Sequence, residues 1–213
     1  MFDLPKSTVV KKVIPKNAFD AYTNSKQKKI ISEKILRITW ANKLSQDTIN
    51  LTGKDIQEIQ IFEIDLKEKL YIKDLLLIID KAIPYQIIFQ VKFNNEFYIS
   101  TSAKHSHPTN DDNAVVDYTF STDWNDENEL YPYIELKNNL DWVYKKFCEQ
   151  INDLFQETNS LDELIFLNRE HDLITRKIAQ LKTSIANCQQ FNRKVELNLK
   201  LKQLEKKLLE LKK

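Results

Sequence analysis

Two series of apolar residues near the end of the chain repeat with alternating steps of four and three residues. This spacing places each series along one side of a helix. If the chain folds back around residues 192 and 193, the two series pair in reverse order. Two antiparallel helices joined at residues 189–193 would then place each apolar residue of one series opposite a residue of the other, and each such pair forms a layer. The expected layers are Ile174 with Leu211, Ile178 with Leu208, Leu181 with Leu204, Ile185 with Leu201, and Cys188 with Leu197.

The beginning of this helical segment is marked by Ser160 and Glu163, which have the spacing typical of a helix N-terminus. The expected turn contains no glycine, so one long helix that dimerises with a shift in register is an alternative to the hairpin. Both arrangements predict an arm of residues 158–213 behind a body of residues 1–157. The apolar residues predicted to make partner contacts in this arm are Ile174, Ile178, Leu181, Ile185, Leu197, Leu201, Leu204 and Leu208.

The body mixes helix and strand patterns in an irregular order. Asn94 and Asn95 form a natural two-residue hairpin turn between two apolar runs, because Asn tolerates positive φ. The order predicts an α+β fold with a single mixed or antiparallel sheet and flanking helices. The expected elements are strands at 58–66, 85–93, 96–101 and 114–122, helices at 17–22, 25–34, 73–82 and 141–155, a strand or helix end at 36–44, and a polar loop at 104–113.

Gly53 is the only glycine in the 213 residues. Loops that cradle phosphate need several glycines, because the backbone must approach the phosphate closely and adopt positive φ. The composition therefore argues against P-loop NTPases, nicotinamide-binding Rossmann domains, Gly-rich kinase loops and methyltransferases. The Gly-x-Ser-x-Gly elbow of serine hydrolases is absent as well. We expect no cofactor, and a binding protein in preference to an enzyme.

One segment nevertheless carries a possible catalytic pattern. Glu63, Asp65 and Lys67 alternate along an expected strand and therefore share one face. Restriction-type nucleases hold a divalent metal with two acids, one of them in an acid-x-Lys pair, and Asp47 or Asp55 is a candidate for the earlier acid. The competing interpretation is a solvated strand end whose charges pair across strands.

The histidine content does not predict a metal site. His105 and His107 lie in the expected polar loop, close to Asp111 and Asp112. A zinc or manganese site needs three or four ligands in fixed geometry, and two histidines in a Ser/Thr/Asn-rich loop are typical of an exposed loop. We expect no bound metal there.

Charge is distributed unevenly, although the formal net charge is only +1. Residues 105–136 contain no Lys or Arg, and Tyr131 and Tyr133 within them are candidates for protein contact, because the acidic surroundings repel phosphate. Residues 193–213 hold eight cationic residues and three glutamates. Such a helix is typical of a solvated coiled-coil face, and it also permits non-specific contact with DNA phosphates. The candidate DNA contacts are Arg193, Lys194 and Lys200.

No stretch of about 18 apolar residues occurs, and the first residues lack a continuous apolar run. We therefore expect a cytoplasmic protein.

Three strings of the sequence carry a family resemblance. They are residues 1–16 (MFDLPKSTVVKKVIPK), 79–85 (IDKAIPY) and 190–198 (QFNRKVELN). They resemble the bacterial domain-of-unknown-function family 4391. The resemblance implies a bacterial protein without an assigned activity, whose gene lies beside those of helicases and DNA methyltransferases of the restriction or phage-defence type.

These observations lead to one main expectation and two alternatives. The main one is a non-enzymatic accessory subunit of a bacterial DNA-processing assembly, which binds a helicase or methyltransferase through its body and coiled-coil arm. One alternative is a metal-dependent restriction-type nuclease. The other is a structural protein that self-associates through the helical arm.

Overall fold

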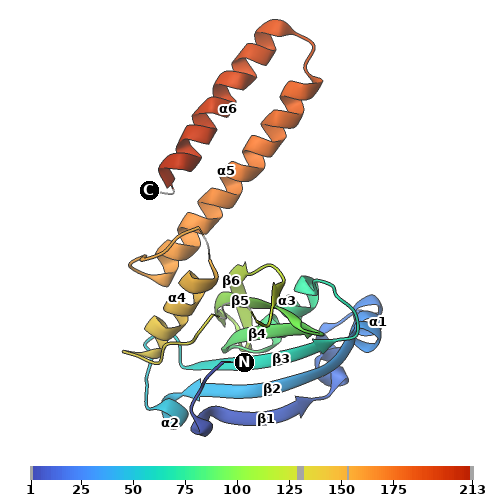
Figure 1. The fold of residues 1–213 in the computed structure, drawn as a ribbon, viewed down its shortest axis with the longest axis vertical. Helices are drawn as coiled ribbons and strands as arrows, with labels where there is room; N and C mark the ends of the chain where they lie inside the picture. The colour runs from blue at the N-terminus through green and yellow to red at the C-terminus, as the bar shows by residue number, and fades with distance from the viewer. Residues whose placement is uncertain (1, 129–131, 153, 212–213) are drawn as a thin grey trace. The chain divides into compact units, whose positions relative to one another are not determined.

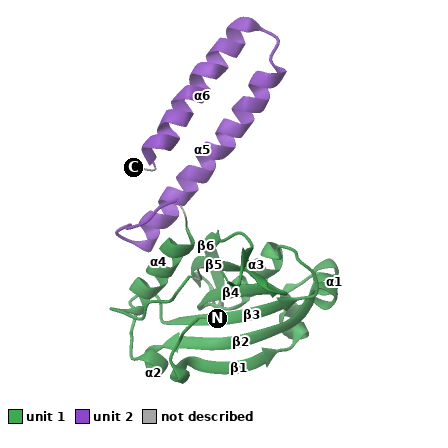
Figure 2. Ribbon diagram, in the orientation of Figure 1, with its two compact units in different colours: residues 1–152 green, residues 153–213 purple. Residues whose placement is uncertain are grey.

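The computed structural model describes residues 2–128, 132–152 and 154–211. The chain divides into two compact units, Met1–Asn152 and Asp153–Lys213 (Figure 2). Each unit has its own pattern of burial. Among the described residues, no helix is both long and apolar enough to cross a lipid bilayer.

The first unit is built on a mixed sheet whose six main strands lie in chain order (Figure 1). β3 and β4 are parallel, and every other neighbouring pair is antiparallel. A short strand, β7, also pairs with β5. The strands are β1 (Val9–Ile14), β2 (Ile35–Ser45), β3 (Glu58–Leu66), β4 (Gln86–Phe93), β5 (Glu96–His107), β6 (Asn110–Ser121) and β7 (Asn125–Asp126).

The predicted α+β class with a mixed sheet and flanking helices is confirmed. The parallel pair requires a crossover connection, which α3 provides between β3 and β4. The helical elements of this unit are η1 (Lys6–Thr8), η2 (Lys16–Tyr22), α1 (Ser25–Lys34), α2 (Gln46–Ile49), α3 (Lys73–Ala82) and α4 (Leu140–Ile151).

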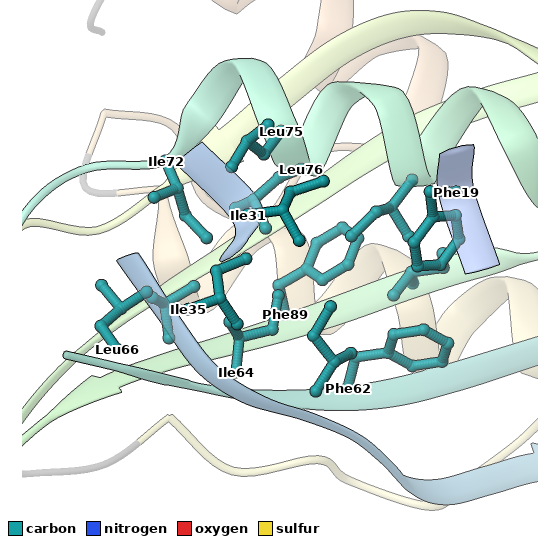
Figure 3. Close-up of a cluster of buried hydrophobic side chains, with 14 of the residues drawn as sticks. Phe19, Ile31, Ile35, Phe62, Ile64, Leu66, Ile72, Leu75, Leu76 and Phe89 are labelled. Carbon is teal, nitrogen blue, oxygen red and sulfur yellow. The ribbon is translucent and has the colours of Figure 1, made fainter. Parts of the chain in front are cut away.

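The main core lies between one face of the sheet and α3, with η2 and α1 beside it (Figure 3). Phe62 of β3 and Phe89 of β4 meet edge to face with ring centroids 6.0 Å apart. Leu75 and Leu76 of α3 belong to the same cluster of buried side chains. Because β3 and β4 are buried along most of their length, they read as nearly continuous apolar runs in the sequence.

The opposite face of the sheet is contacted by α4. Successive residues of a strand point to opposite faces, and Ser102 of β5 bonds to α3 whereas its neighbour Thr101 bonds to α4. The hydroxyl groups of Thr101 and Tyr144 lie 2.8 Å apart, and both side chains are fully buried. The sheet is therefore the middle layer, with α3, η2 and α1 on one face and α4 on the other.

A buried ion pair joins the crossover helix to β5. The Nζ of Lys104 donates to Asp80 Oδ1 at 3.0 Å, and to the backbone oxygens of Asp80 at 2.9 Å and Ile83 at 2.8 Å. Ser102 Oγ donates to Asp80 Oδ2 at 2.6 Å and lies 2.9 Å from Thr119 Oγ1. Burial raises the pKa of Asp80 and lowers the pKa of Lys104, which disfavours both charges. The hydrogen bonds offset this desolvation, and Lys104 also satisfies carbonyls at the C-terminal end of α3.

The polar loop predicted for residues 104–113 is wrong. β5 continues to His107 and β6 begins at Asn110, so these residues form the end of a β-hairpin. In the sequence, Lys104 has the polar surroundings of a loop residue. The carboxylate of Asp80 that pairs with it in the core lies far away along the chain and gives no local signal.

The loop before β3 is fixed by the first turn of α4. The carboxylate of Asp141 accepts the backbone N–H groups of Lys54 at 2.6 Å, Asp55 at 3.0 Å and Ile56 at 2.8 Å. A Cβ on Gly53 would lie 2.0 Å from the backbone oxygen of Ile56. This close approach explains why glycine occupies the position, and its role is steric.

The second unit is a helical hairpin of α5 (Leu161–Asn187) and α6 (Phe191–Leu211), in which α6 lies beside the C-terminal part of α5 (Figure 1). Ser160 caps α5 by accepting the N–H of Glu163 at 3.1 Å. The helices end and begin around residues 188–190, so the turn forms without glycine. The predicted antiparallel pair is confirmed, and the chain does not form the single long helix considered as the alternative.

Burial along α6 follows the predicted seam. Among its described residues, only Leu197, Leu201, Leu204, Leu208 and Leu211 are half-buried, and all others are exposed. The matching positions Ile174 and Ile178 of α5 are buried, and Leu181, Ile185 and the C-cap residue Cys188 are half-buried. Ion pairs flank the seam, with Lys182 at 3.3 Å from Glu205 and Lys207 at 3.1 Å from Glu170.

Replacing Gly53 with alanine should destabilise the first unit. The added Cβ cannot fit unless the loop moves away from Ile56, and such overpacking costs roughly 1–3 kcal/mol. Urea unfolding followed by fluorescence measures the loss. The neighbouring Thr52→Ala, whose side chain is exposed, is the matched control and should change stability by less than about 0.5 kcal/mol. Equal stability of the two variants would contradict the assigned role of Gly53.

Replacing Lys104 with methionine should be among the most damaging single changes. It leaves the carboxylate of Asp80 buried and unpaired, which costs about 3–5 kcal/mol of unfolding free energy. The double variant Asp80→Leu/Lys104→Met should recover much of that loss, because no charge remains buried. Lys28→Met, which breaks an exposed ion pair with Asp20, is the control and should have little effect. If the double variant were as unstable as Lys104→Met, the desolvation argument would be wrong.

Candidate functional site

The candidate catalytic residues lie at the end of β3, within a row of alternating charges. The strand register places Asp65 of β3 between Arg37 of β2 and Lys92 of β4. Nε and Nη2 of Arg37 donate to Asp65 Oδ2 at 3.1 and 2.9 Å. The carboxylate of Asp65 is therefore already compensated by a guanidinium group.

Glu63 lies on the same face of β3 as Asp65, as the alternation predicts. Its carboxylate is 3.6 Å from Nζ of Lys92, and both side chains are mostly buried. Its neighbour in β4 is Gln90, a buried neutral amide. Two acids therefore share one face, and each has a cationic partner from a neighbouring strand.

The remaining members of the nuclease pattern are placed elsewhere. Asp55 precedes the start of β3, and the strand extends about 23 Å from that start at Glu58 to Asp65. Asp47 in α2 follows the end of β2 at the same far end of the sheet. Lys67 donates from Nζ to the backbone oxygen of Ser32 at 3.0 Å. Among the described residues, no group of three or more His, Cys, Asp or Glu side chains is arranged to hold a metal ion. The nuclease stays a prediction.

The histidines occupy the β5–β6 hairpin. Nδ1 of His105 lies 2.7 Å from Oδ2 of Asp117, and Nδ1 of His107 lies 3.2 Å from Oγ1 of Thr109. The two rings are thus engaged with different partners. The side chains of Asp111 and Asp112 lie outside the described part of the structure.

Only one of the two candidate tyrosines can be placed. Tyr133 is exposed, and its backbone N–H donates to Oε1 of Gln150 at 3.1 Å. An exposed ring on an anchored backbone is suited to protein contact. Tyr131 lies outside the described residues.

The hairpin also carries an apolar surface outside the seam. Four large apolar side chains of α6 point away from α5, and we call them the outer stripe. At about 100° per residue, they fall within about 80° of one another, roughly opposite the seam. They are Phe191 (78% exposed), Val195 (44%), Leu199 (58%) and Leu209 (65%).

The signal for the outer stripe is present in the sequence. Phe191, Val195 and Leu199 are spaced by four residues, a spacing that keeps side chains on one side of a helix. The four-and-three repeat of the seam is stronger, and it predicts only the apolar side of the helix that faces α5. The apolar residues predicted to bind a partner therefore lie in the contact between α5 and α6, while the outer stripe is exposed.

Cationic side chains cover much of the remaining surface of α6. Arg193, Lys194 and Lys200, the candidate DNA contacts, are all exposed. DNA binding by them stays a prediction. Lys202 and Lys206 are also exposed and lie on the side of the outer stripe, whereas Lys212 and Lys213 lie outside the described residues.

Comparison with known proteins gives one match. A family model described as "Domain of unknown function (DUF4391)" matches residues 2–208. No curated protein and no solved structure matches the chain. The match covers both compact units, including the hairpin up to the last turn of α6. On this match, which confirms the resemblance seen in the sequence, the chain belongs to the DUF4391 family.

Proposed function

We propose that this chain is a non-enzymatic interaction subunit that binds another protein through its C-terminal hairpin. One observation carries the proposal: α6 is apolar on two opposite sides, and α5 contacts only one of them. None of the described residues of α6 is fully buried.

A two-helix hairpin explains the seam but leaves the outer stripe unexplained. A surface helix of a folded domain ordinarily has one apolar side and one polar side. A helix with apolar residues on both sides is typical of a position between two neighbours. Exposed apolar side chains gathered on one side of a helix, as Phe191, Val195 and Leu199 are, mark a site of interaction.

The arrangement of charges in the first unit supports a binding role over a catalytic one. Arg37 and Lys92 compensate the carboxylates of Asp65 and Glu63, so these acids are stabilised as ion pairs across strands. A metal-binding carboxylate must offer its oxygens to the ion, and these oxygens face cationic groups. The position of the pairs fits the competing interpretation of Glu63 and Asp65 as a charged strand end.

The family resemblance suggests the class of partner. We propose a helicase or DNA methyltransferase of a bacterial restriction or phage-defence assembly, encoded beside this chain. In that setting the first unit would add a second contact surface, with the exposed Tyr133 as one candidate. The hairpin carries the clearest candidate surface, the exposed apolar side chains of the outer stripe.

The test is co-expression of the tagged chain with the helicase and methyltransferase encoded beside it, followed by affinity purification and mass spectrometry. We expect one of them to elute in stoichiometric amount. Leu201→Asp, which places a charge in the seam, should abolish the complex because the hairpin loses its packing. Leu201→Met is the matched control and should preserve it.

Two other outcomes would favour the alternatives. If the chain elutes alone and the wild type cleaves DNA with manganese, and Asp65→Ala abolishes the cleavage, the nuclease is correct and the proposal fails. If the chain elutes alone and its mass in solution is that of a dimer, which Leu201→Asp reduces to a monomer, self-association is its function.

A further inference from the structure

We infer that the outer stripe of α6 binds a helix of another protein whose apolar side is flanked by acidic residues. The inference rests on the proposed function and specifies the chemistry of the partner. It is drawn from the position of two lysines among the four apolar residues of the stripe.

The stripe has the dimensions of a helix-binding surface. Phe191 and Leu209 are eighteen positions apart, or about 27 Å at 1.5 Å per residue. Phe191 and Leu209 lie at the same angle around the helix axis, with Val195 and Leu199 beside them. A helix of similar length could therefore contact all four side chains along one side.

Two lysines interrupt this apolar side between Leu199 and Leu209. Lys202 and Lys206 lie about 20° and 60° from Phe191 around the axis, within the angle that the stripe covers. Lys206 is 3.7 Å from Glu210 in an exposed pair one turn away. For Lys202, no ion pair occurs among the residues that the structure describes. An exposed pair such as that of Lys206 contributes little to stability, so both lysines are available to a partner.

The charges near the seam are organised differently. Lys207 pairs with Glu170 and Glu205 pairs with Lys182, so the lysine beside the seam is matched by an acid of α5. By the same rule, a helix bound over Lys202 and Lys206 needs carboxylates at their level. Complementary charge of this kind selects the partner and sets its register.

A second copy of α6 fits this surface less well. An antiparallel pairing that matches Phe191 with Leu209 of the second copy places Lys206 at the level of its Lys194. The same pairing places Lys202 at the level of Asn198, so neither lysine meets a carboxylate of the second copy. Nucleic acid would use the lysines but not the exposed Phe and Leu side chains, because the duplex backbone offers phosphate and not apolar surface.

The test measures binding of two labelled synthetic helical peptides to the full chain by fluorescence anisotropy. Both carry the same leucine side, which is flanked by glutamates in one peptide and by lysines in the other. We expect the glutamate peptide to bind about tenfold more tightly at low salt, and the difference to shrink at high salt. The double variant Lys202→Glu/Lys206→Glu should reverse the preference.

Matched variants separate charge from apolar contact. Arg176→Glu/Lys177→Glu makes the same change of charge on α5 and should leave the preference unchanged, since both residues lie away from the outer stripe. Phe191→Ser/Leu199→Ser should weaken binding of both peptides. Circular dichroism and thermal unfolding confirm that each variant keeps its helices.

Three results would overturn the inference. The folded wild type could bind neither peptide, it could bind both equally, or it could form a dimer in solution that Phe191→Ser/Leu199→Ser dissociates. Binding of neither peptide, or equal binding of both, would not contradict the proposed function if co-purification with the neighbouring proteins still requires an intact seam. Failure of that co-purification, with the peptide preference intact, would instead contradict the partner class proposed above.

Discussion

The buried pair of Asp80 and Lys104 is the interaction on which the rest of the first unit depends. It fixes the crossover helix α3 to β5, and α3 is the connection that makes β3 and β4 parallel. Removing two charges from water is unfavourable, so the pair is stable only because every one of its hydrogen bonds has good geometry. A shift of β5 by one residue would turn Lys104 to the opposite face. The pair therefore also specifies the register of the sheet.

How much could be predicted differs between the two units, for a physical reason. Within the hairpin, residues in contact are related by a local repeat, so the layers from Ile174 to Leu208 could be read from spacing alone. In the sheet, contacts join residues far apart in sequence. The shared face of Glu63 and Asp65 follows from alternation within one strand, but their partners Arg37 and Lys92 come from β2 and β4 and depend on strand order.

The same distinction explains the error at Lys104. A lysine in a polar stretch is ordinarily exposed, and only the approach of Asp80 makes its burial favourable. The outer stripe was missed for a different reason, because its spacing of Phe191, Val195 and Leu199 is visible in the sequence. The seam repeat predicts one apolar side for α6 and contains no information on a second one. The structure shows that both sides exist at once, since the seam accounts for only one.

The partial burial of α6 connects its stability with its proposed role. An isolated helix of about twenty residues is only marginally stable in water, and helices in proteins are stabilised mainly by tertiary packing. Two helices in contact cover only part of each other, which is why the leucines of the α6 seam stay half-buried. A third helix over the outer stripe would bury Phe191, Leu199 and Leu209. Binding would then stabilise α6, because any ligand that prefers the folded state shifts the folding equilibrium toward it.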